Sequence, residues 1–360
     1  MMTSIEQAPS VTSAPKKPLY EASTQFRNWR FSPQQLFDLR TSLNVAAVAV
    51  IRNTLENEKP GSSSIVSFLN AEEEHLLVKL YITKITQLCS LFRFPEEVEA
   101  TAITYLKRFY LKNTVMDWHP KNVMLTALFL ATKTTNNPIS LEAYTSHIPR
   151  TAPADVLDLE FLVAQSLGFE FAVWHSHRAL WGMMLDVQNL PGSPQDTRPI
   201  YESALAHVRA SRLTDAELIY TPSQIALAAF SIASPELASQ WSLSKLSADS
   251  SSTLLSPDSL SGVTETIKSM ITSGGHPPSV DAVREVDRRL KLCKNPEKIV
   301  GSHAYLAKKA EEEKKAEEKR HKKASEANQA MKDGDPFGNQ LEVRKAPVGL
   351  VDYDDDDDDD

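Results

Sequence analysis

The stretch that decides the fold is HPKNVMLTALFLATKTTNN, residues 119–137, which has helical spacing and is apolar nearly all round. Pro120 suits the first position of a helix, where its missing N–H would have no partner in any case. A helix that is apolar on every side is typical of the buried centre of a bundle. A second stretch, YTPSQIALAAFSIASPE at residues 220–236, matches these apolar positions when Pro222 is placed on Pro120. The sequence therefore indicates that one structural element is used twice.

Segments with helical spacing of apolar residues surround both copies of this element. In the first half, five such segments lie between residues 70 and 171, and the fifth is expected to run from about Ala154 to Leu167 and to stop at Gly168. In the second half they fall near 174–189, 195–212, 222–233, 236–247 and 256–272. No segment alternates strictly enough between apolar and polar residues to predict a strand. The predicted fold is all-α, with two tandem five-helix bundles.

Further helices flank the two bundles. Ser32 and Pro33 predict an N-cap and a first helical residue, and this helix would reach about Lys59 with Val50 on its apolar face. Residues 307–324 predict a charged, solvated helix. The expected organisation is a disordered N-terminus (1–22), an N-terminal helix and linker (23–69), the first bundle (70–171), the second bundle (172–275), C-terminal helices of which the last is highly charged (276–330), and a disordered acidic tail (331–360).

Composition and charge exclude several classes of protein. No apolar run is long enough to span a bilayer, and Cys89 and Cys293 are too few for a disulfide framework or a cysteine-rich zinc site. The net charge is −8, and eight negative charges come from Asp352 and Asp354–Asp360 alone, so the rest of the chain is neutral. Proteins that bind nucleic acid directly concentrate Lys and Arg on one face. We therefore expect neither direct nucleic-acid binding nor membrane association.

No constellation of residues supports catalysis. The chain contains no GxxxxGK[ST] or GxGxxG loop, no kinase catalytic loop and no GxSxG elbow. His175 and His177 form an HxH pair without the further ligands of a metal motif, so they are interpreted as helix-start or core histidines. We predict that the chain is not an enzyme and that it has no catalytic residue, cofactor or metal. The basic run KRHKK, residues 319–323, could serve nuclear import or could simply be solvated.

Lys133 is the one charge at the end of the core-like stretch, and it has two interpretations. It could interact favourably with the dipole of its own helix. However, Pro235 occupies the matching position in the second copy, so the fold itself does not require a lysine there. Glu160 lies in an otherwise apolar segment that can line the same face of a bundle. A cation and an anion flanked by the aromatic residues Phe161, Phe169 and Phe171 would suit capture of a helix from a partner.

These residues resemble the cyclin family. The resemblance is carried by ALFLATK (127–133) and LDLEFLVAQSLGFEF (157–171), and it is closer to the cyclin H group through QFRNWRFS (25–32), KRFYLKNTVMDWHP (107–120) and YTPSQIALAAFSIAS (220–234). It covers roughly residues 24–295 and implies two cyclin boxes with an extra helix before the first and after the second. The segment EEEHLLVKLYI differs from the MRAIL-like docking patch of cell-cycle cyclins. Recruitment of substrates through that patch is therefore not expected.

The resemblance also implies a function and partners. It implies a regulatory subunit that binds and activates the cyclin-dependent kinase of the CDK-activating module, with a RING-finger assembly factor and the TFIIH core as further partners. Such a complex phosphorylates the RNA polymerase II tail and acts in the nucleus, in transcription initiation and cell-cycle control. In the family, the residues matching Lys133 and Glu160 hold the kinase segment that positions a catalytic glutamate, and Phe169 and Phe171 match apolar contact positions.

Two other functions remain open at this point. A duplicated cyclin-fold factor of the TFIIB type would bridge polymerase and promoter DNA, but it would need a basic stripe, and the body of this chain is neutral. A helical scaffold that binds no kinase would make Lys133 and Glu160 incidental. The sequence leaves the role of the aspartate run open.

Overall fold

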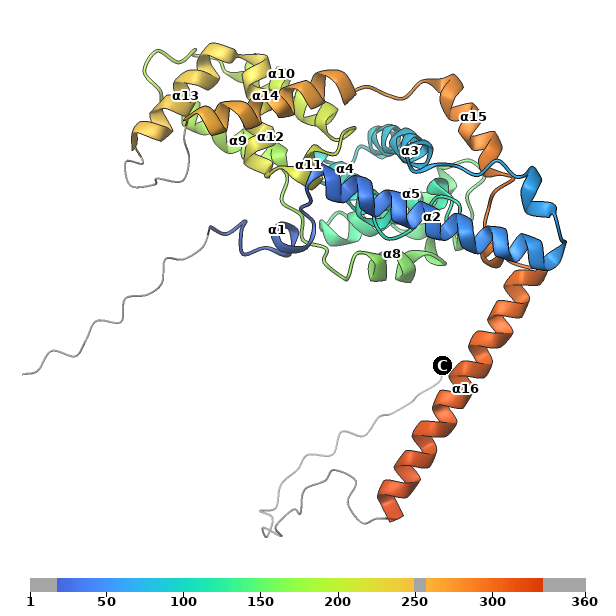
Figure 1. Cartoon of the computed structure of the whole chain (residues 1–360). Helices are drawn as coiled ribbons and strands as arrows, with labels where there is room; N and C mark the ends of the chain where they lie inside the picture. The colour runs from blue at the N-terminus through green and yellow to red at the C-terminus, as the bar shows by residue number, and fades with distance from the viewer. Residues whose placement is uncertain (1–17, 249–256, 333–360) are drawn as a thin grey trace, which may run out of the picture. The chain divides into compact units, whose positions relative to one another are not determined.

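The structure, a computed structural model, describes residues 18–248 and 257–332. Every regular element in these two ranges is a helix (Figure 1). The helices are α1 (Thr24–Asn28), α2 (Pro33–Glu58), α3 (Ala71–Phe92), α4 (Glu96–Phe109), α5 (Pro120–Thr134), α6 (Leu141–Ser146), α7 (Ala154–Leu157), α8 (Glu160–Ser166), α9 (Ser176–Val187), α10 (Arg198–Ser211), α11 (Ala216–Ile219), α12 (Pro222–Ala233), α13 (Pro235–Ala248), α14 (Pro257–Gly274), α15 (Val280–Leu290) and α16 (His303–Lys332), with short 3-10 turns at Ser62–Ile65 and Pro296–Lys298.

The first bundle is built around α5. This helix packs against α3, α4, α7 and α8, and its residues from Val123 to Thr132 are all buried. Helix α4 is also buried on most sides, with Val98, Ala102 and Phe109 fully enclosed. A helix can be apolar all round only where neighbouring helices cover every face. The prediction that this stretch is the centre of a bundle is confirmed.

The second bundle repeats this plan around α12. Helix α12 packs against α9, α10, α13 and α14, and its residues from Ile225 to Phe230 are buried. Like α5, it has a proline in its first turn, and Thr221 and Gln224 form a capping box before it. The predicted all-α fold with a duplicated central element is confirmed.

Helix starts follow the polar caps that the sequence predicts. Ser32 accepts a hydrogen bond from the backbone N–H of Gln35 at 3.1 Å, and the Gln35 side chain accepts one in return from Ser32 N at 2.7 Å. Asn70 and Glu73 form the same reciprocal arrangement, with both distances 2.9 Å. Each capping box satisfies two N–H groups that the first turn of a helix leaves without partners. The caps therefore fix where α2 and α3 begin.

Three local expectations differ from the structure. The segment expected as one helix over 154–167 is divided into α7 and α8, so Glu160 is the first residue of α8 and not a mid-helix residue. Val50, expected on the apolar face of α2, is 45% exposed, because the helix buries Leu36, Ala47 and Ile51 on a different face. Residues 18–22, expected in the disordered N-terminus, form a turn in which Tyr20 packs edge-on against the Phe26 and Trp174 rings. The rest of that segment, and the acidic tail from residue 333, lie outside the described residues.

The helices flanking the bundles contribute to their packing. Among the described residues, those up to Ile299 form one compact unit, and those from Val300 form a second. Within the first unit, α15 inserts Val283, Val286 and Leu290 into the core of the first bundle. Helix α2 reaches the second bundle, where Arg40 makes two hydrogen bonds of 2.7 Å to the carboxylate of Asp215.

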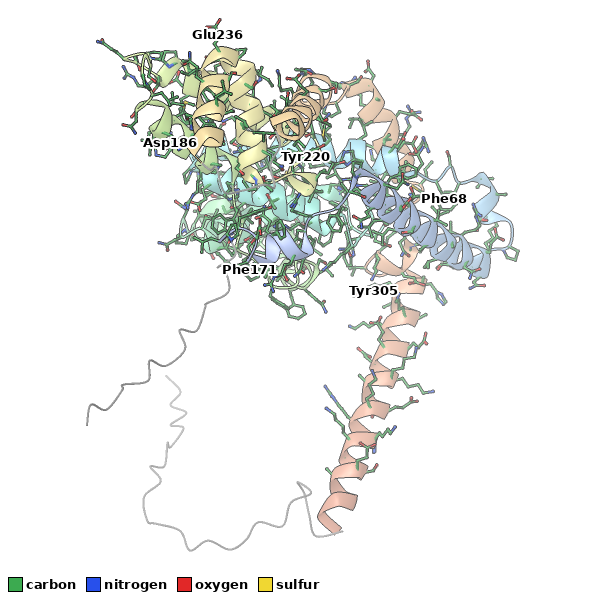
Figure 2. The ribbon with its side chains drawn as sticks, turned by 60° about the vertical axis from the view of Figure 1, so that its left-hand side comes forward. Phe68, Phe171, Asp186, Tyr220, Glu236 and Tyr305 are labelled. Carbon is green, nitrogen blue, oxygen red and sulfur yellow. The ribbon has the colours of Figure 1, made fainter. Side chains whose placement is uncertain are left out.

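Ion pairs cross the seam between the two bundles. Lys107 of α4 has a side chain that is 3% exposed, and its Nζ lies 2.9 Å from Glu217 Oε1 and 2.7 Å from the Thr214 carbonyl oxygen. Arg212 lies 2.7 Å from Glu96 and 3.2 Å from Glu99. Tyr220, labelled in Figure 2, lies beside this seam and lines a small cavity with Arg212 and Glu217. Buried charges of this kind need their partners, so the seam holds the bundles in one arrangement.

Candidate functional site

An exposed ion pair lies at the end of the central helix of the first bundle. Lys133, in the last turn of α5, places its Nζ 2.6 Å from Oε1 of Glu160, the first residue of α8. The side chains are 43% and 26% exposed, so both charges are open to solvent. Lys133 Nζ also lies 4.5 Å from the ring centroid of Phe129, a cation–π distance. The two charges that the sequence singles out do meet on one face.

Exposed aromatic rings lie next to this ion pair. Phe161 follows Glu160 on α8 and is 69% exposed, and Phe169 is 56% exposed. Their ring centroids are 6.1 Å apart, and Leu157 on α7 is a further exposed apolar residue. Contiguous exposed apolar surface beside a polar group is characteristic of a protein interaction site. We call Lys133, Glu160, Phe161 and Phe169 the docking face.

The backbone at the end of α8 turns Phe169 outward. The N–H of Gly168 donates to Gln165 O at 2.9 Å, and the N–H of Phe169 donates to Ala164 O at 3.0 Å, which is the Schellman pattern of a helix end. Gly168 has φ +63°, as its predicted role as a helix stop requires. Phe169 also has a positive φ, +58°, a conformation that costs energy for a bulky residue. Backbone strain is therefore located at an exposed aromatic residue of the docking face.

Tyr105 joins the end of α5 to the aromatic segment. This fully buried tyrosine donates its hydroxyl to the carbonyl oxygen of Phe171 at 2.7 Å, and the same hydroxyl lies 3.0 Å from Oγ1 of Thr134, the neighbour of Lys133. Phe171 itself is half-buried and packs edge-on against the Tyr105 ring, so it supports the face from below. One hydroxyl thereby fixes the two chain segments of the docking face relative to each other. Burial is the main cause that raises the pKa of Tyr105 to about 12, so it stays a neutral donor.

The N-terminal helix holds the segment from the other side. Trp29 Nε1 donates to Glu170 Oε2 at 2.5 Å, and Asn28 Nδ2 donates to Glu170 Oε1 at 2.6 Å. The guanidinium of Arg108 stacks 4.8 Å from the Trp29 ring centroid. Because Glu170 stands between Phe169 and Phe171, these bonds fix the direction of both rings. Figure 2 labels Phe171, where this segment passes α1.

The sequence anticipated most, but not all, of this arrangement. Lys133, Glu160, Phe161 and Phe169 lie together on one exposed face, and Phe171 lies beneath it. Trp29, Tyr105 and Arg108 were not singled out as parts of the site, because their roles depend on partners distant in sequence. The only signal for them was the match of QFRNWRFS and KRFYLKNTVMDWHP to the cyclin H group.

The other sites considered from the sequence have structural explanations. His175 is buried, and its Nε2 lies 2.9 Å from Thr101 Oγ1, so it is a core residue at the start of α9. Burial and the neighbouring His177 hold the pKa of His175 well below the usual value. Across the residues that the structure describes, no cluster of three or more metal-ligating side chains occurs. Within the same residues, no helix is both long and apolar enough to cross a bilayer.

The comparisons with known proteins agree with the geometry. Residues 49–172 match the family model of the cyclin N-terminal domain, and residues 175–272 match that of the cyclin C-terminal domain. Cyclin mcs2 of Schizosaccharomyces pombe is 30% identical over 326 residues, which cover 88% of the chain and 98% of mcs2. The chain belongs to the cyclin family.

Other similar proteins indicate which cyclins this one resembles. The putative cyclin-H of Dictyostelium discoideum is 32% identical over 221 residues, 59% of this cyclin and 75% of that protein. The CAK complex of Chaetomium thermophilum, solved with ATP-gamma-S, contains a chain that is 28% identical, with a TM-score of 0.72 over 82% of this cyclin and 94% of that chain. The cryoEM structure of yeast TFIIK (Kin28/Ccl1/Tfb3) contains a chain that is 30% identical. Its TM-score is 0.58 over 70% of this cyclin and 100% of that chain. The predicted membership of the cyclin H group is confirmed.

Proposed function

We propose that this cyclin binds and activates the cyclin-dependent kinase of a CDK-activating module and contributes no catalytic residue itself. The single observation that carries the proposal is the docking face, in which an exposed ion pair is flanked by two exposed aromatic rings. Aromatic anchors beside charged hydrogen-bonding groups are the usual composition of an energetic hot spot. The similar chains in the CAK and TFIIK complexes support a kinase as the partner.

The docking face suits the capture of a kinase helix and the loop before it. Lys133 Nζ can donate to free carbonyl oxygens at a helix end, and the Glu160 carboxylate can accept from free backbone N–H groups. Phe161 and Phe169 would cover the apolar side of the same helix. In this reading the cyclin holds the kinase αC helix inward, so that its glutamate pairs with the ATP-binding lysine. Lys133, Glu160, Phe161, Phe169 and Phe171 are the proposed kinase-binding residues.

The further partners belong to the same proposal. The TFIIK complex contains Tfb3 besides Kin28 and Ccl1, which supports a third subunit for this cyclin, and we propose a RING-finger assembly factor. We also propose an association with the TFIIH core, phosphorylation of the RNA polymerase II tail as the output, and the nucleus as the location. The relatives are cyclins, and none of those cited is a TFIIB-type factor, so the DNA-bridging alternative has no support of its own.

Reconstitution tests the proposal directly. The purified cyclin alone is expected to transfer no phosphate, whereas addition of the cyclin-dependent kinase from the same cells should give a 1:1 complex on gel filtration. The complex should phosphorylate a peptide of the polymerase II tail far faster than the kinase alone. A kinase that neither binds nor gains activity would contradict the proposal. Copurification of the cyclin from its own cell extract would then identify any other partner.

A further inference from the structure

Helix α16 carries most of the charge in the second compact unit. It runs unbroken from His303 to Lys332 (Figure 1) and its side chains from 309 to 327 are exposed. In its first half, charges are neutralised one turn away. Lys315 Nζ lies 2.5 Å from Glu311, and Lys309 Nζ lies 3.9 Å from Glu313. Pairs at this spacing stabilise an exposed helix.

The next turn of the same helix is different. We call Lys319, Arg320, Lys322 and Lys323 the basic patch. All four are exposed, and among the described side chains none of the four has a carboxylate oxygen within 4.0 Å. Lys319 and Lys323 are one helical turn apart, with Lys322 beside them, so like charges face one another and repel. The basic patch therefore places four cations, none of them in a closed ion pair, within about 6 Å of helix length.

A dense cluster of negative charges follows the basic patch in the sequence. Asp352 and Asp354–Asp360, which we call the acidic segment, carry eight negative charges and lie outside the described residues. Between the end of α16 at Lys332 and Asp354 lie 21 residues, and a flexible chain of that length would span about 25 Å on average. Such a linker gives an effective concentration of millimolar order for contact between its ends.

We propose that the acidic segment docks intramolecularly on the basic patch of α16 and screens it from other polyanions. The argument rests on charge complementarity and on the linker length. Elsewhere in the sequence the longest runs of acidic residues are Glu72–Glu74 and Glu311–Glu313, so no other segment has a comparable density of negative charge. Nucleic acid binds proteins mainly through Lys and Arg that neutralise its phosphates. With the acidic segment docked, four negative charges remain in excess, so a polyanion is repelled where the uncovered patch would attract it.

A distance measurement tests the docking in the full chain. Ala324→Cys and Tyr353→Cys accept a pair of fluorescent dyes, while the native Cys89 and Cys293 stay unlabelled, because they are 2% and 0% exposed and burial raises the pKa of both thiols. At low salt, energy transfer should report a separation well below the roughly 25 Å of a free linker. Energy transfer should fall toward the free-linker value in 1 M NaCl, where the screening length is about 3 Å.

Two charge variants locate the contact. Replacing the four patch cations by Gln should abolish the short separation. The matched control replaces four exposed cations that already have carboxylate partners, Arg284, Arg288, Lys291 and Lys315, and it should leave the separation unchanged. Equal losses in the two variants would mean that net charge alone compacts the chain. That result, or a free-linker distance in the unchanged chain, would overturn the proposal.

Binding of a 20-base-pair DNA duplex, measured by fluorescence anisotropy, tests the screening itself. Changing Asp354–Asp360 to Asn should tighten duplex binding at least about threefold, which is the gain expected if the millimolar effective concentration of the acidic segment is about twice its dissociation constant from the patch. Adding the four patch substitutions should remove that gain. A gain that persists without the patch would place the uncovered site elsewhere and would contradict the proposal. The kinase plays no part in either measurement, so failure here is distinct from failure of the proposed function.

Discussion

Trp29 donates its indole N–H to Glu170 Oε2 at 2.5 Å, across 141 positions of the sequence. The acceptor stands between Phe169 and Phe171, and Arg108 stacks on the face of the donor ring. Helix α1 is therefore part of the support for the docking face, although none of its side chains belongs to that face. A short N-terminal element thus connects the extra segment before the first bundle to the proposed kinase-binding face.

Trp29→Phe removes this hydrogen bond and keeps most of the apolar packing. A hydrogen bond to a charged group contributes about 1.5–3 kcal/mol, and the Glu170 carboxylate would keep its bond from Asn28. We expect the affinity for the kinase to fall about tenfold, at ~1.4 kcal/mol per decade. Trp181→Phe is the matched control, because Trp181 is 53% exposed on the second bundle and packs against Tyr201. Equal affinities for the two variants, measured by titration calorimetry, would show that α1 does not position the face.

Lys133→Ala and Glu160→Ala should separate binding from stability. The pair is exposed, and such pairs typically contribute about 0–1 kcal/mol to folding, so thermal melting should barely change. At an interface, loss of a desolvated charged hydrogen bond costs about 2–5 kcal/mol, so each variant should weaken the kinase complex tenfold or more. Arg284→Ala, which breaks the exposed Arg284–Asp281 pair on α15, should change neither quantity. Unchanged affinity in both variants would leave Lys133 as a simple helix cap.

Phe169→Asn should make the cyclin more stable and a weaker binder. Phe169 has φ +58° and is 56% exposed, so the strain is not offset by burial of its ring. Asparagine tolerates this conformation well, and relief of such strain is of the order of 1 kcal/mol. We expect a higher melting temperature together with a kinase affinity reduced at least tenfold. A variant that gains stability without losing affinity would show that the ring is not an anchor.

Asp215→Asn should destabilise the cyclin at neutral pH but progressively less in acid. Burial alone would raise the pKa of Asp215, but the hydrogen bonds and charge of Arg40 outweigh it and hold the pKa well below 3.8. A lowered carboxyl pKa gives stability that is complete above the unfolded value and lost as the pH falls toward the folded value. Leaving Arg40 without its half-buried partner should cost about 2 kcal/mol at pH 7. Urea unfolding from pH 7 to 3.5 should show the difference shrinking below about pH 4, whereas a constant difference would argue against the ion pair.

The sequence predicts the centre of each bundle well because periodicity and caps are local signals. The prolines at the starts of α5 and α12, and the caps at Ser32 and Asn70, lie where the helices begin. Lys133 could be singled out because Pro235 stands at its place in the second copy. The approach of Lys133 to Glu160 followed from placing two helix ends on one face of a bundle.

The parts that escaped prediction have no local signal. Helix α1 has five residues, too few to show a helical period. The break between α7 and α8 could not be predicted because the apolar pattern continues across it. Val156 before the break and Val163 after it are both buried. The residue type of Phe169 does not indicate its left-handed backbone, whereas a glycine at position 168 does indicate one. Tyr105 contacts the Phe171 carbonyl and the Thr134 hydroxyl, which are distant in sequence and meet it only in the folded chain.

Lys107 shows that the first bundle depends on the second for the partners of a buried charge. Its side chain is buried in the first bundle, and its two polar partners in the described chain, the Glu217 carboxylate and the Thr214 carbonyl, belong to the second. A fragment limited to the first bundle would retain a cation with neither partner, at a cost of several kcal/mol against a total stability of about 5–15 kcal/mol. The two bundles are thereby mutually dependent: we expect them to unfold in a single transition, and we expect neither to fold as an autonomous domain.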